Sequence, residues 1–409
     1  MHNLNRMRKL ASFLGLFLII FQVSGQGNYD ELSGKDLELN PITTAVPFLT
    51  IAPDARGGAM GDAGVSSTPD ANSMHWNPAK YAFIDGKMGI SASYSPWLRD
   101  LVNDINLAYL TGYYRFDQNQ VIAASLRYFS LGDIVFTDNN GLDIGTYQPN
   151  EFSFAATYSR KLTTNLSGAV AGRFIYSNLT LGQTVGSQDT KAGTSVAADV
   201  SVYWRKEINL FDVNAVLAWG VNISNIGNKI SYTDNDATKD FLPTNLRLGP
   251  SITLDLDEFN QLSFMVDINK LLVPTPPIYA KDTSGNFIIG PDNKLVVAEG
   301  MDPDVSVIKG MLQSFYDAPG GFSEEMRELM YSFGVEYWYD QQFAIRGGFF
   351  YEDRTKGNRK FFTLGAGLRY NLFGLDVSYL IPLEQQNPLE NTLRFSLYLD
   401  FEAFSGQNN

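Results

Sequence analysis

The sequence contains no cysteine, so disulfides, thiolate metal sites and thiol catalysis are excluded. Histidine is scarce as well: the whole chain has two, and His75 is the one outside the first 25 residues. An enzyme that depends on a catalytic histidine would have to use His75. Acidic residues outnumber basic ones, and the formal net charge is −13. Because nucleic acid is bound through clusters of Lys and Arg, no nucleic-acid partner is expected.

The chain also lacks a hydrophobic run long enough for a transmembrane helix, which needs about 20 apolar residues. The apolar run 10–21 is shorter, follows three basic residues and precedes small residues at 23–25. This pattern predicts a secretory signal peptide over 1–25, with a permanent anchor as the alternative. No cysteine follows the expected cut, which excludes a lipoprotein anchor.

From about residue 87 onward, apolar and polar side chains alternate along the chain. In the segment 391–401, every second residue from Leu393 to Phe401 is apolar, and the residues between them are mostly polar. Alternate side chains of a strand point to opposite faces, so each such segment predicts a strand with one apolar face. Fourteen strands are expected, at 87–95, 105–116, 121–130, 151–160, 166–176, 194–206, 211–223, 244–255, 261–270, 330–339, 343–351, 361–370, 373–381 and 391–401.

The connections between these segments alternate between long and short without exception. A soluble β-sandwich gives no reason for this alternation, whereas an outer-membrane barrel has short periplasmic turns and longer external loops. A closed barrel also leaves no backbone group unpaired in lipid. The sequence therefore predicts an all-β fold, a 14-stranded antiparallel transmembrane β-barrel over 87–409, located in the outer membrane.

Two regions do not follow the strand pattern. The segment 26–86 is rich in Pro and Gly, and we expect it to be an N-terminal hatch or plug, because a barrel of this size has room for one. The segment 271–329 is expected to be a long external loop containing two short helices, about 304–316 and 323–330, the second starting at Ser323. A loop of this length is expected to be folded and functional.

The remaining signals of chemistry are weak. His75 is expected to have a structural or hydrogen-bonding role, and the glycines of 57–61 lack the Lys and Ser/Thr of a phosphate-binding loop. Asp234, Asp236, Thr238 and Asp240 alternate in a way that could hold Ca²⁺, but a solvated acidic loop is the preferred interpretation. No catalytic residue, cofactor or metal is therefore predicted.

Two stretches of the expected plug carry a family resemblance. The segments 55–64 (ARGGAMGDAG) and 72–79 (NSMHWNPA) resemble the opening of the PorV/PorQ family of FadL-like outer-membrane barrels. Within them, Asn77, Pro78 and Ala79 match the short NPA motif of the hatch. The length of the chain and its large fifth external loop favour the PorV (LptO) type of this family, which belongs to the type IX secretion system of Bacteroidetes.

This resemblance implies a secretion role without catalysis. Such proteins partner a giant translocon barrel, SprA or Sov, receive secreted substrates through the substrates' C-terminal domains, and deliver them to an attachment complex that contains PorU. We expect these contacts on the external loops, above all 271–329. The candidate binding residues of this loop are Met301, Met311, Phe315, Tyr316, Phe322 and Met326.

The alternative function is that of a FadL-type outer-membrane transporter of hydrophobic small molecules, and an outer-membrane enzyme is a third and weaker one. A transporter needs a largely apolar path through the lumen. The strand pattern instead predicts an inward-facing charged set, expected to pair internally and to close the lumen. This set comprises Arg127, Arg173, Asp199, Asp267, Glu336, Arg346, Arg369, Arg394 and Asp400.

Overall fold

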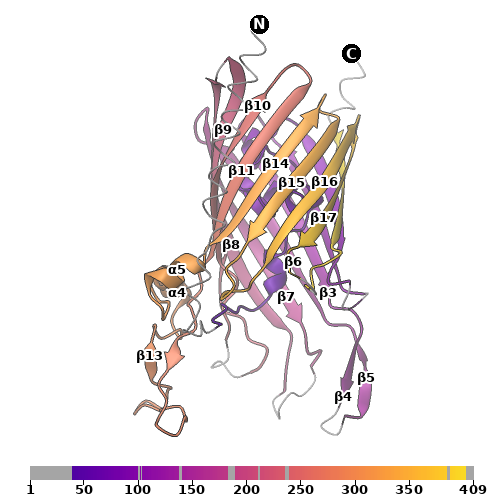
Figure 1. The fold of residues 1–409 in the computed structure, drawn as a ribbon. Coiled ribbons are helices and arrows are strands. Elements are labelled where there is room, and N and C mark those ends of the chain that lie inside the picture. The colour runs from indigo at the N-terminus through magenta and orange to yellow at the C-terminus, as the bar shows by residue number, and fades with distance from the viewer. Residues whose placement is uncertain are drawn as a thin grey trace.

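The computed structural model describes residues 39–401 apart from 100, 101, 103, 138–140, 183–188, 211, 235–238 and 385–386. In this part of the chain, antiparallel strands close into one barrel, with β1 paired to β18 (Figure 1). The barrel strands are β1 (Met88–Pro96), β2 (Asn106–Arg115), β3 (Gln120–Ser130), β6 (Asn150–Lys161), β7 (Leu166–Asn178), β8 (Gly193–Leu210), β9 (Val213–Gly227), β10 (Asn245–Asp255), β11 (Asn260–Leu271), β14 (Met330–Tyr339), β15 (Phe343–Tyr351), β16 (Lys360–Tyr370), β17 (Phe373–Pro382) and β18 (Leu393–Asp400).

The predicted 14-stranded antiparallel barrel is confirmed, and each expected segment corresponds to one barrel strand. The largest differences are at β8 and β9, which both extend beyond the predicted ends. Their pairing continues as far as Leu210↔Val213, so the turn between them is shorter than the sequence pattern suggested. Alternation alone does not mark where hydrogen bonding stops, and this is why strand ends were the least accurate part of the prediction.

The two ends of the barrel differ in the length of their connections. The short turns 116–119, 162–165, 256–259, 340–342 and 371–372 gather at one end, which we call the inner end. The long connections gather at the other, outer end, which is the lower one in Figure 1. One of them contains the small hairpin of β4 (Ile134–Thr137) and β5 (Asp143–Tyr147). By the rule for outer-membrane barrels, the outer end faces the outside of the cell.

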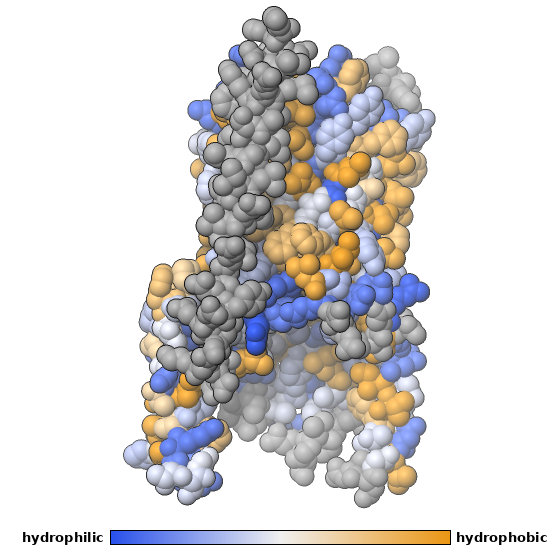
Figure 2. All heavy atoms as spheres, viewed as in Figure 1, coloured by the Kyte–Doolittle hydropathy of each residue, from blue (hydrophilic) through white to orange (hydrophobic). Residues whose placement is uncertain are grey.

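The barrel is apolar outside and polar inside. In β6, buried and more exposed positions alternate, with Phe154 and Tyr158 exposed and Ser153 and Ser159 buried. Figure 2 shows apolar side chains over much of the outer wall on the side in view. Side chains that would form the core of a water-soluble sandwich therefore point outward, which is the arrangement that a lipid environment requires. No helix among the described residues is long and apolar enough to cross a membrane.

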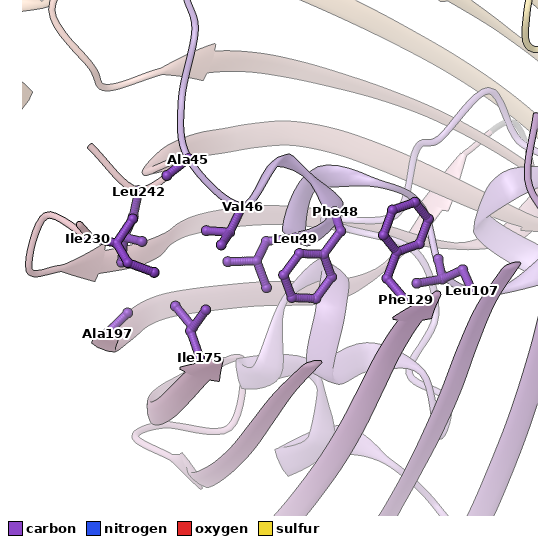
Figure 3. Close-up of a cluster of buried hydrophobic side chains, with 10 residues drawn as sticks. All are labelled: Ala45, Val46, Phe48, Leu49, Leu107, Phe129, Ile175, Ala197, Ile230 and Leu242. Carbon is purple, nitrogen blue, oxygen red and sulfur yellow. The ribbon is translucent and has the colours of Figure 1, made fainter. Parts of the chain in front are cut away.

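Residues 39–86 run through the lumen and form a plug. Its regular elements are η2 (Pro47–Thr50), α2 (Ala55–Gly58), α3 (Ser73–Trp76) and η3 (Pro78–Phe83). At the outer end, Phe48 and Leu49 pack against the wall in a cluster that includes Leu107, Phe129 and Ile175 (Figure 3). A second apolar cluster anchors the plug toward the inner end and includes Tyr81, Tyr113 and Tyr398.

Hydrogen bonds join the middle of the plug to the polar inner face of the wall. The Asp267 carboxylate accepts from the backbone N–H groups of Gly64 (2.8 Å) and Val65 (2.9 Å). The Thr363 hydroxyl accepts from the Gly61 N–H and donates to the Ala59 carbonyl, both at 2.8 Å. Because buried backbone groups need partners, polar wall residues are what allow an irregular segment to be buried here.

One contact leaves no space for a side chain between plug and wall. A Cβ added to Gly348 of β15 would lie 2.0 Å from the Gly61 nitrogen and 2.1 Å from the Met60 carbonyl carbon. Gly61 itself has φ +68°, which favours glycine, and a Cβ there would meet the Phe349 backbone. The plug is therefore seated backbone to backbone on β15.

Gly348→Val should displace the plug and leave the barrel closed, because the added side chain overlaps plug backbone only. Overpacking of this kind costs about 1–3 kcal/mol, so amide hydrogen exchange over 59–65 should accelerate roughly tenfold or more. The control is Gly172→Val on β7, where an added Cβ meets nothing within 4 Å. Native exchange rates in the Gly348 variant would contradict the described seating.

Candidate partner-binding site

The connection 272–329 is the most elaborate of the outer-end segments. It begins as a β-finger, whose strands β12 (Ile278–Tyr279) and β13 (Val297–Glu299) pair and whose pairing continues through isolated bridges such as Ile289↔Leu295. It then forms the helices α4 (Val307–Gln313) and α5 (Phe322–Arg327), beside the barrel in Figure 1. The two predicted helices are present but shorter. α5 starts at Phe322 behind the cap Gly321, not at Ser323, and ends before the next strand.

Helix α5 has the reverse of the usual polarity. It buries the carboxylate side chains of Glu324 and Glu325, and Glu328 directly after it is also buried. The same helix exposes Met326 and Phe322, and Phe322 is 78% exposed. A helix on the surface of a globular protein normally buries its apolar stripe and exposes its charges. The inversion means that the apolar face of α5 is presented to the surroundings.

Helix α4 shows the same inversion. Ile308 and Leu312, one turn apart, are both exposed, whereas Gly310 and Gln313 are buried. The aromatic residues Phe315 and Tyr316, just after the helix, are exposed as well. Large exposed apolar patches on otherwise folded proteins mark sites of interaction with another protein or with a membrane. We call the exposed side chains Ile308, Leu312, Phe315, Tyr316, Phe322 and Met326 the loop-five patch.

Buried ion pairs hold this unit on the barrel. Glu328 lies 2.6 Å from the Lys270 Nζ of β11 and 3.0 Å from the Lys356 Nζ of the connection 352–359. Lys270 and Lys356 also pair with Glu325 and Glu324 respectively. All of these side chains are at least nine-tenths buried. Buried charges are stable only when they are paired in this way.

The start of the plug joins the same network. Asn40 donates a hydrogen bond to the Glu324 carboxylate (3.0 Å) and another to the Pro276 carbonyl (3.1 Å). Its backbone N–H donates to the Thr355 carbonyl at 3.0 Å. The plug, the connection 352–359 and the loop with α5 are thus tied together at one point of the outer rim.

Asp317 is a buried carboxylate of this loop that forms no ion pair with the described residues. It accepts from the Thr275 N–H at 3.2 Å, and its Oδ1 is buried without a hydrogen-bond partner. Burial is the main cause that raises the pKa of Asp317 to about 6; the nearby carboxylates of Glu325 and Glu328 act in the same direction, and the Thr275 hydrogen bond opposes them. Asp317 therefore takes up a proton near pH 6, where a free aspartate side chain is still charged.

The predicted binding residues of this loop fall into two groups. Phe315, Tyr316, Phe322 and Met326 are exposed and belong to the loop-five patch, whereas Met301 and Met311 are half-buried. The sequence prediction missed Ile308 and Leu312. Their i, i+4 spacing could have indicated a common helix face, but nothing in the local sequence tells that this face points away from the barrel.

The NPA motif of the plug has a structural role. The Asn77 side chain accepts from the Ala79 N–H to cap η3 and donates to the carbonyls of Val65 and Val202. Pro78 occupies the first helical turn, where its missing N–H is not needed. Ala79 is fully buried, and its carbonyl accepts from Ser167 at 2.6 Å. The motif therefore fixes the plug to β7 and β8.

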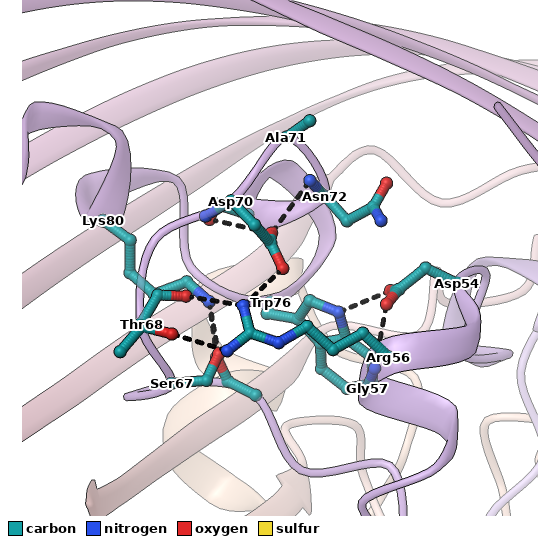
Figure 4. A network of polar contacts seen from close by, with 12 residues as sticks. Asp54, Arg56, Gly57, Ser67, Thr68, Asp70, Ala71, Asn72, Trp76 and Lys80 are labelled. Carbon is teal, nitrogen blue, oxygen red and sulfur yellow. Dashed lines mark hydrogen bonds and ion pairs between the residues drawn. The ribbon is translucent and has the colours of Figure 1, made fainter. Parts of the chain in front are cut away.

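The predicted pairing of lumenal charges is confirmed, with plug residues as additional partners. Arg56 of the plug binds Glu336 through two nitrogens and lies 2.8 Å from Asp70. Figure 4 shows Arg56 between Thr68 and Asp70, beside the Asp54 carboxylate that caps α2. From Glu336 the ion pairs continue along the wall through Arg346, Asp376 and Arg369. This chain of ion pairs therefore draws its members from the four neighbouring strands β14 to β17.

The other charged residues that were predicted to face the lumen differ in their contacts and in their exposure. Arg173 and Asp199 pair at 2.6 Å, and Arg394 lies 3.7 Å from Asp62 of the plug. Arg127 donates to plug carbonyls and to the Nδ1 of His75, which agrees with the hydrogen-bonding role expected for this histidine. Asp400, at the inner rim, is exposed rather than buried.

The acidic external loop considered for Ca²⁺ is only partly described. Asp234 pairs with Lys191, while Asp236 and Thr238 lie outside the described residues. Within the described part of the chain, no group of three or more His, Cys, Asp or Glu residues is placed to hold a metal ion.

An apolar outer wall, a polar plugged lumen, short turns at one end and long connections at the other define an outer-membrane β-barrel. A family model described as "Type IX secretion system protein PorV" matches residues 34–278. The chain belongs to the PorV family, as the plug segments indicated. It is an outer-membrane component of the type IX secretion system.

Solved structures with a similar fold include hydrocarbon transporters. The toluene transporter TodX of Pseudomonas putida is 11% identical with a TM-score of 0.47, over 88% of this chain and 98% of that chain. The toluene transporter TbuX of Ralstonia pickettii is 11% identical with a TM-score of 0.44, over 84% and 96%. A Pseudomonas aeruginosa FadL homologue is 11% identical with a TM-score of 0.42, over 89% and 100%. No curated protein matches the chain, and none of these similarities bears on what it binds.

Glu328→Gln should loosen the loop with α4 and α5 from the rim, because it breaks the two ion pairs through which Glu328 joins Lys270 to Lys356 and leaves each lysine with a single carboxylate partner. Removing one partner of a buried ion pair typically costs about 3–5 kcal/mol. Limited proteolysis should then cut within 272–329, while the barrel keeps its folded migration on unheated gels. The exposed Glu299→Gln in the same loop is the control and should resist cleavage like the native chain.

Asp317 makes the attachment of this loop depend on pH. The pKa of Asp317 is higher in the folded state than in the unfolded chain, so the folded state binds the proton more tightly. The contribution of Asp317 to the stability of the folded loop therefore increases as the pH falls through about 6. Asp317→Asn should imitate the protonated form and protect 272–329 from proteolysis at pH 7.5. The difference in protease resistance between this variant and the native chain should shrink at pH 5. A difference that stays constant with pH would contradict the protonation of Asp317 near pH 6.

Proposed function

We propose that this protein partners the giant translocon barrel (SprA or Sov), receives secreted substrates through their C-terminal domains, and passes them to the attachment complex that contains PorU. The role is one of binding and transfer, without catalysis. Membership of the PorV family supports the type IX setting. The inverted polarity of α4 and α5, which presents the loop-five patch, is the observation that supports a protein-binding role for this loop.

The composition of the patch fits a protein partner. Aromatic side chains contribute most to binding energy when a partner covers them, and this patch contains Phe315, Tyr316 and Phe322. Met326 adds an unbranched side chain that adapts to partners of different shape. A protein that receives many substrates through one shared domain needs a surface of this kind.

The β-finger extends the exposed apolar surface away from the barrel. Phe287, Ile289 and Leu295 on it are exposed, and its pairing is limited to short ladders. Short apolar strands with free edges are suited to pairing with a strand of another chain. We assign the finger and the loop-five patch to one continuous contact surface.

The attachment of the loop favours this assignment. Buried ion pairs hold α5 to β11 and to the connection 352–359, so the patch is carried at a fixed place on the rim. A fixed surface loses less entropy on binding than a mobile loop would. The charged, plug-filled lumen, in contrast, offers no apolar path that would favour the transporter alternative.

The test replaces the aromatic centre of the patch. The triple variant Phe315→Ser, Tyr316→Ser and Phe322→Ser should reach the outer membrane in normal amount, because these side chains are at least half exposed and the barrel strands do not depend on them. Secretion of cargo should fall at least tenfold, as the loss of several hot-spot side chains implies. A gentle detergent pull-down with mass spectrometry should lose the very large barrel and the proteins that share one C-terminal domain.

The matched control carries Ile134→Ser and Val135→Ser in the β4–β5 hairpin, which is also external and exposes both side chains. It should secrete cargo like the native chain. Deleting most of 271–329 should have the effect of the triple variant with the barrel still folded. Unchanged secretion in both altered chains would remove this loop from the mechanism, and saturable fatty-acid uptake that depends on the protein would favour the transporter alternative.

A further inference from the structure

A cavity of about 70 Å³ lies at the outer end of the lumen, between the plug and the wall. Its sides come from the plug, from the outer ends of β9, β10, β11, β14 and β15, and from Arg359. A buried water needs about 10–15 Å³ of space, so the cavity is large enough for several waters or for one small ligand.

The polar atoms that lack partners around this cavity are unusually many. Six lining residues each have a buried side-chain nitrogen or oxygen without a hydrogen bond in the described structure. They are Asp62 Oδ1, which lies 3.7 Å from the Arg394 guanidinium without a hydrogen bond, and His75 Nε2, Asn222 Oδ1, Asn225 Oδ1, Asn245 Oδ1 and Arg247 Nη1. Buried polar groups are nearly always paired, because an unpaired one loses its hydration without compensation. Such a group of orphaned atoms around one cavity indicates a missing partner.

The asparagines face the cavity as acceptors. The Asn222 Nδ2 donates to the Trp76 carbonyl at 3.2 Å, and the Asn225 Nδ2 donates to the Pro243 carbonyl at 3.0 Å. These bonds fix the amide orientation and leave each Oδ1 to accept from something else. Both residues are at least nine-tenths buried, so the acceptors are held in place before any ligand arrives.

His75 and Arg247 supply donors. A guanidinium can only donate, so the contact of Arg127 with the His75 Nδ1 at 2.8 Å places the proton of the neutral ring on Nε2. The Arg247 Nε donates to Asn269 at 2.6 Å, and its guanidinium lies 4.6 Å from the centre of the Trp76 ring. Arg247 is thereby fixed in position with Nη1 unpaired.

The cavity also has an apolar side, formed by Leu49, Leu271, Met330 and Phe350. A simple ion would leave this side unused, and an ion of either sign would be repelled by Asp62 or by Arg247. A hydroxyl group, in contrast, both donates and accepts, and a sugar ring carries several hydroxyls around an apolar C–H face. We propose that this cavity binds one sugar ring, either free or at the end of a glycan chain. The proposal is independent of how cargo is handled.

The test measures binding of glucose, galactose, mannose and N-acetylglucosamine, and of their methyl glycosides, to the full chain in a detergent without a sugar headgroup. Saturation-transfer NMR should show saturable binding of at least one sugar. Binding of the free sugar alone would assign a free ligand, and binding of the methyl glycoside as well would assign the end of a glycan.

Two variants separate the site from the fold. Asn245→Ala removes a half-buried acceptor and should weaken binding about tenfold, as the loss of one hydrogen bond to a ligand implies. The control Ser332→Ala removes an equally unpaired lumenal hydroxyl of β14 that does not line the cavity, and it should bind like the native chain. No saturable binding by the folded native chain, or equal affinity in both variants, would overturn the proposal and leave the cavity to ordered water.

Discussion

Lipid offers no hydrogen bonds, and the whole structure follows from that constraint. A chain that crosses lipid as strands must pair every backbone group with another strand, and the closing ladder from β1 to β18 completes this pairing. The closed barrel has an outer face in contact with lipid and an inner face around the lumen, and the two faces need side chains of opposite polarity. The outer face becomes apolar, and the inner face receives the polar half of each alternating strand. An enclosed polar surface needs partners of its own, and the plug supplies them with backbone amides, with Arg56 and with His75.

Much of this could be predicted, because its cause is local. Alternation with period two identified each barrel strand, and the regular exchange of long and short connections indicated a membrane barrel. Charge on the inward face predicted internal pairing. Which charges pair was not predictable, because Arg56 and Glu336 are far apart in sequence and only the seating of the plug brings them together. Tyr113 of β2 is likewise buried against Tyr81 of the plug, a contact that depends on how the plug is seated.

The loop-five patch shows a different limit of sequence reasoning. The sequence of α5 contains both acidic and apolar residues, and ordinary helix rules would bury the apolar ones. Here Lys270 and Lys356 reach the helix from distant parts of the chain and draw its carboxylates inward. Tertiary contacts thus decide which face is free. Met301 and Met311, also expected at the binding surface for their side-chain type, are half-buried.

The position of Asn40 has a mechanical consequence. The described part of the plug begins at the outer rim, where Asn40 donates a hydrogen bond to Glu324 of α5. At the inner end, the plug continues directly into β1. The plug is therefore attached at both ends of the barrel. One end is hydrogen-bonded to the external loop, and the other end continues into the barrel wall. A pull on that loop from outside would be transmitted through Asn40 to the interior, so tension at the cell surface and the seating of the plug are coupled by geometry alone.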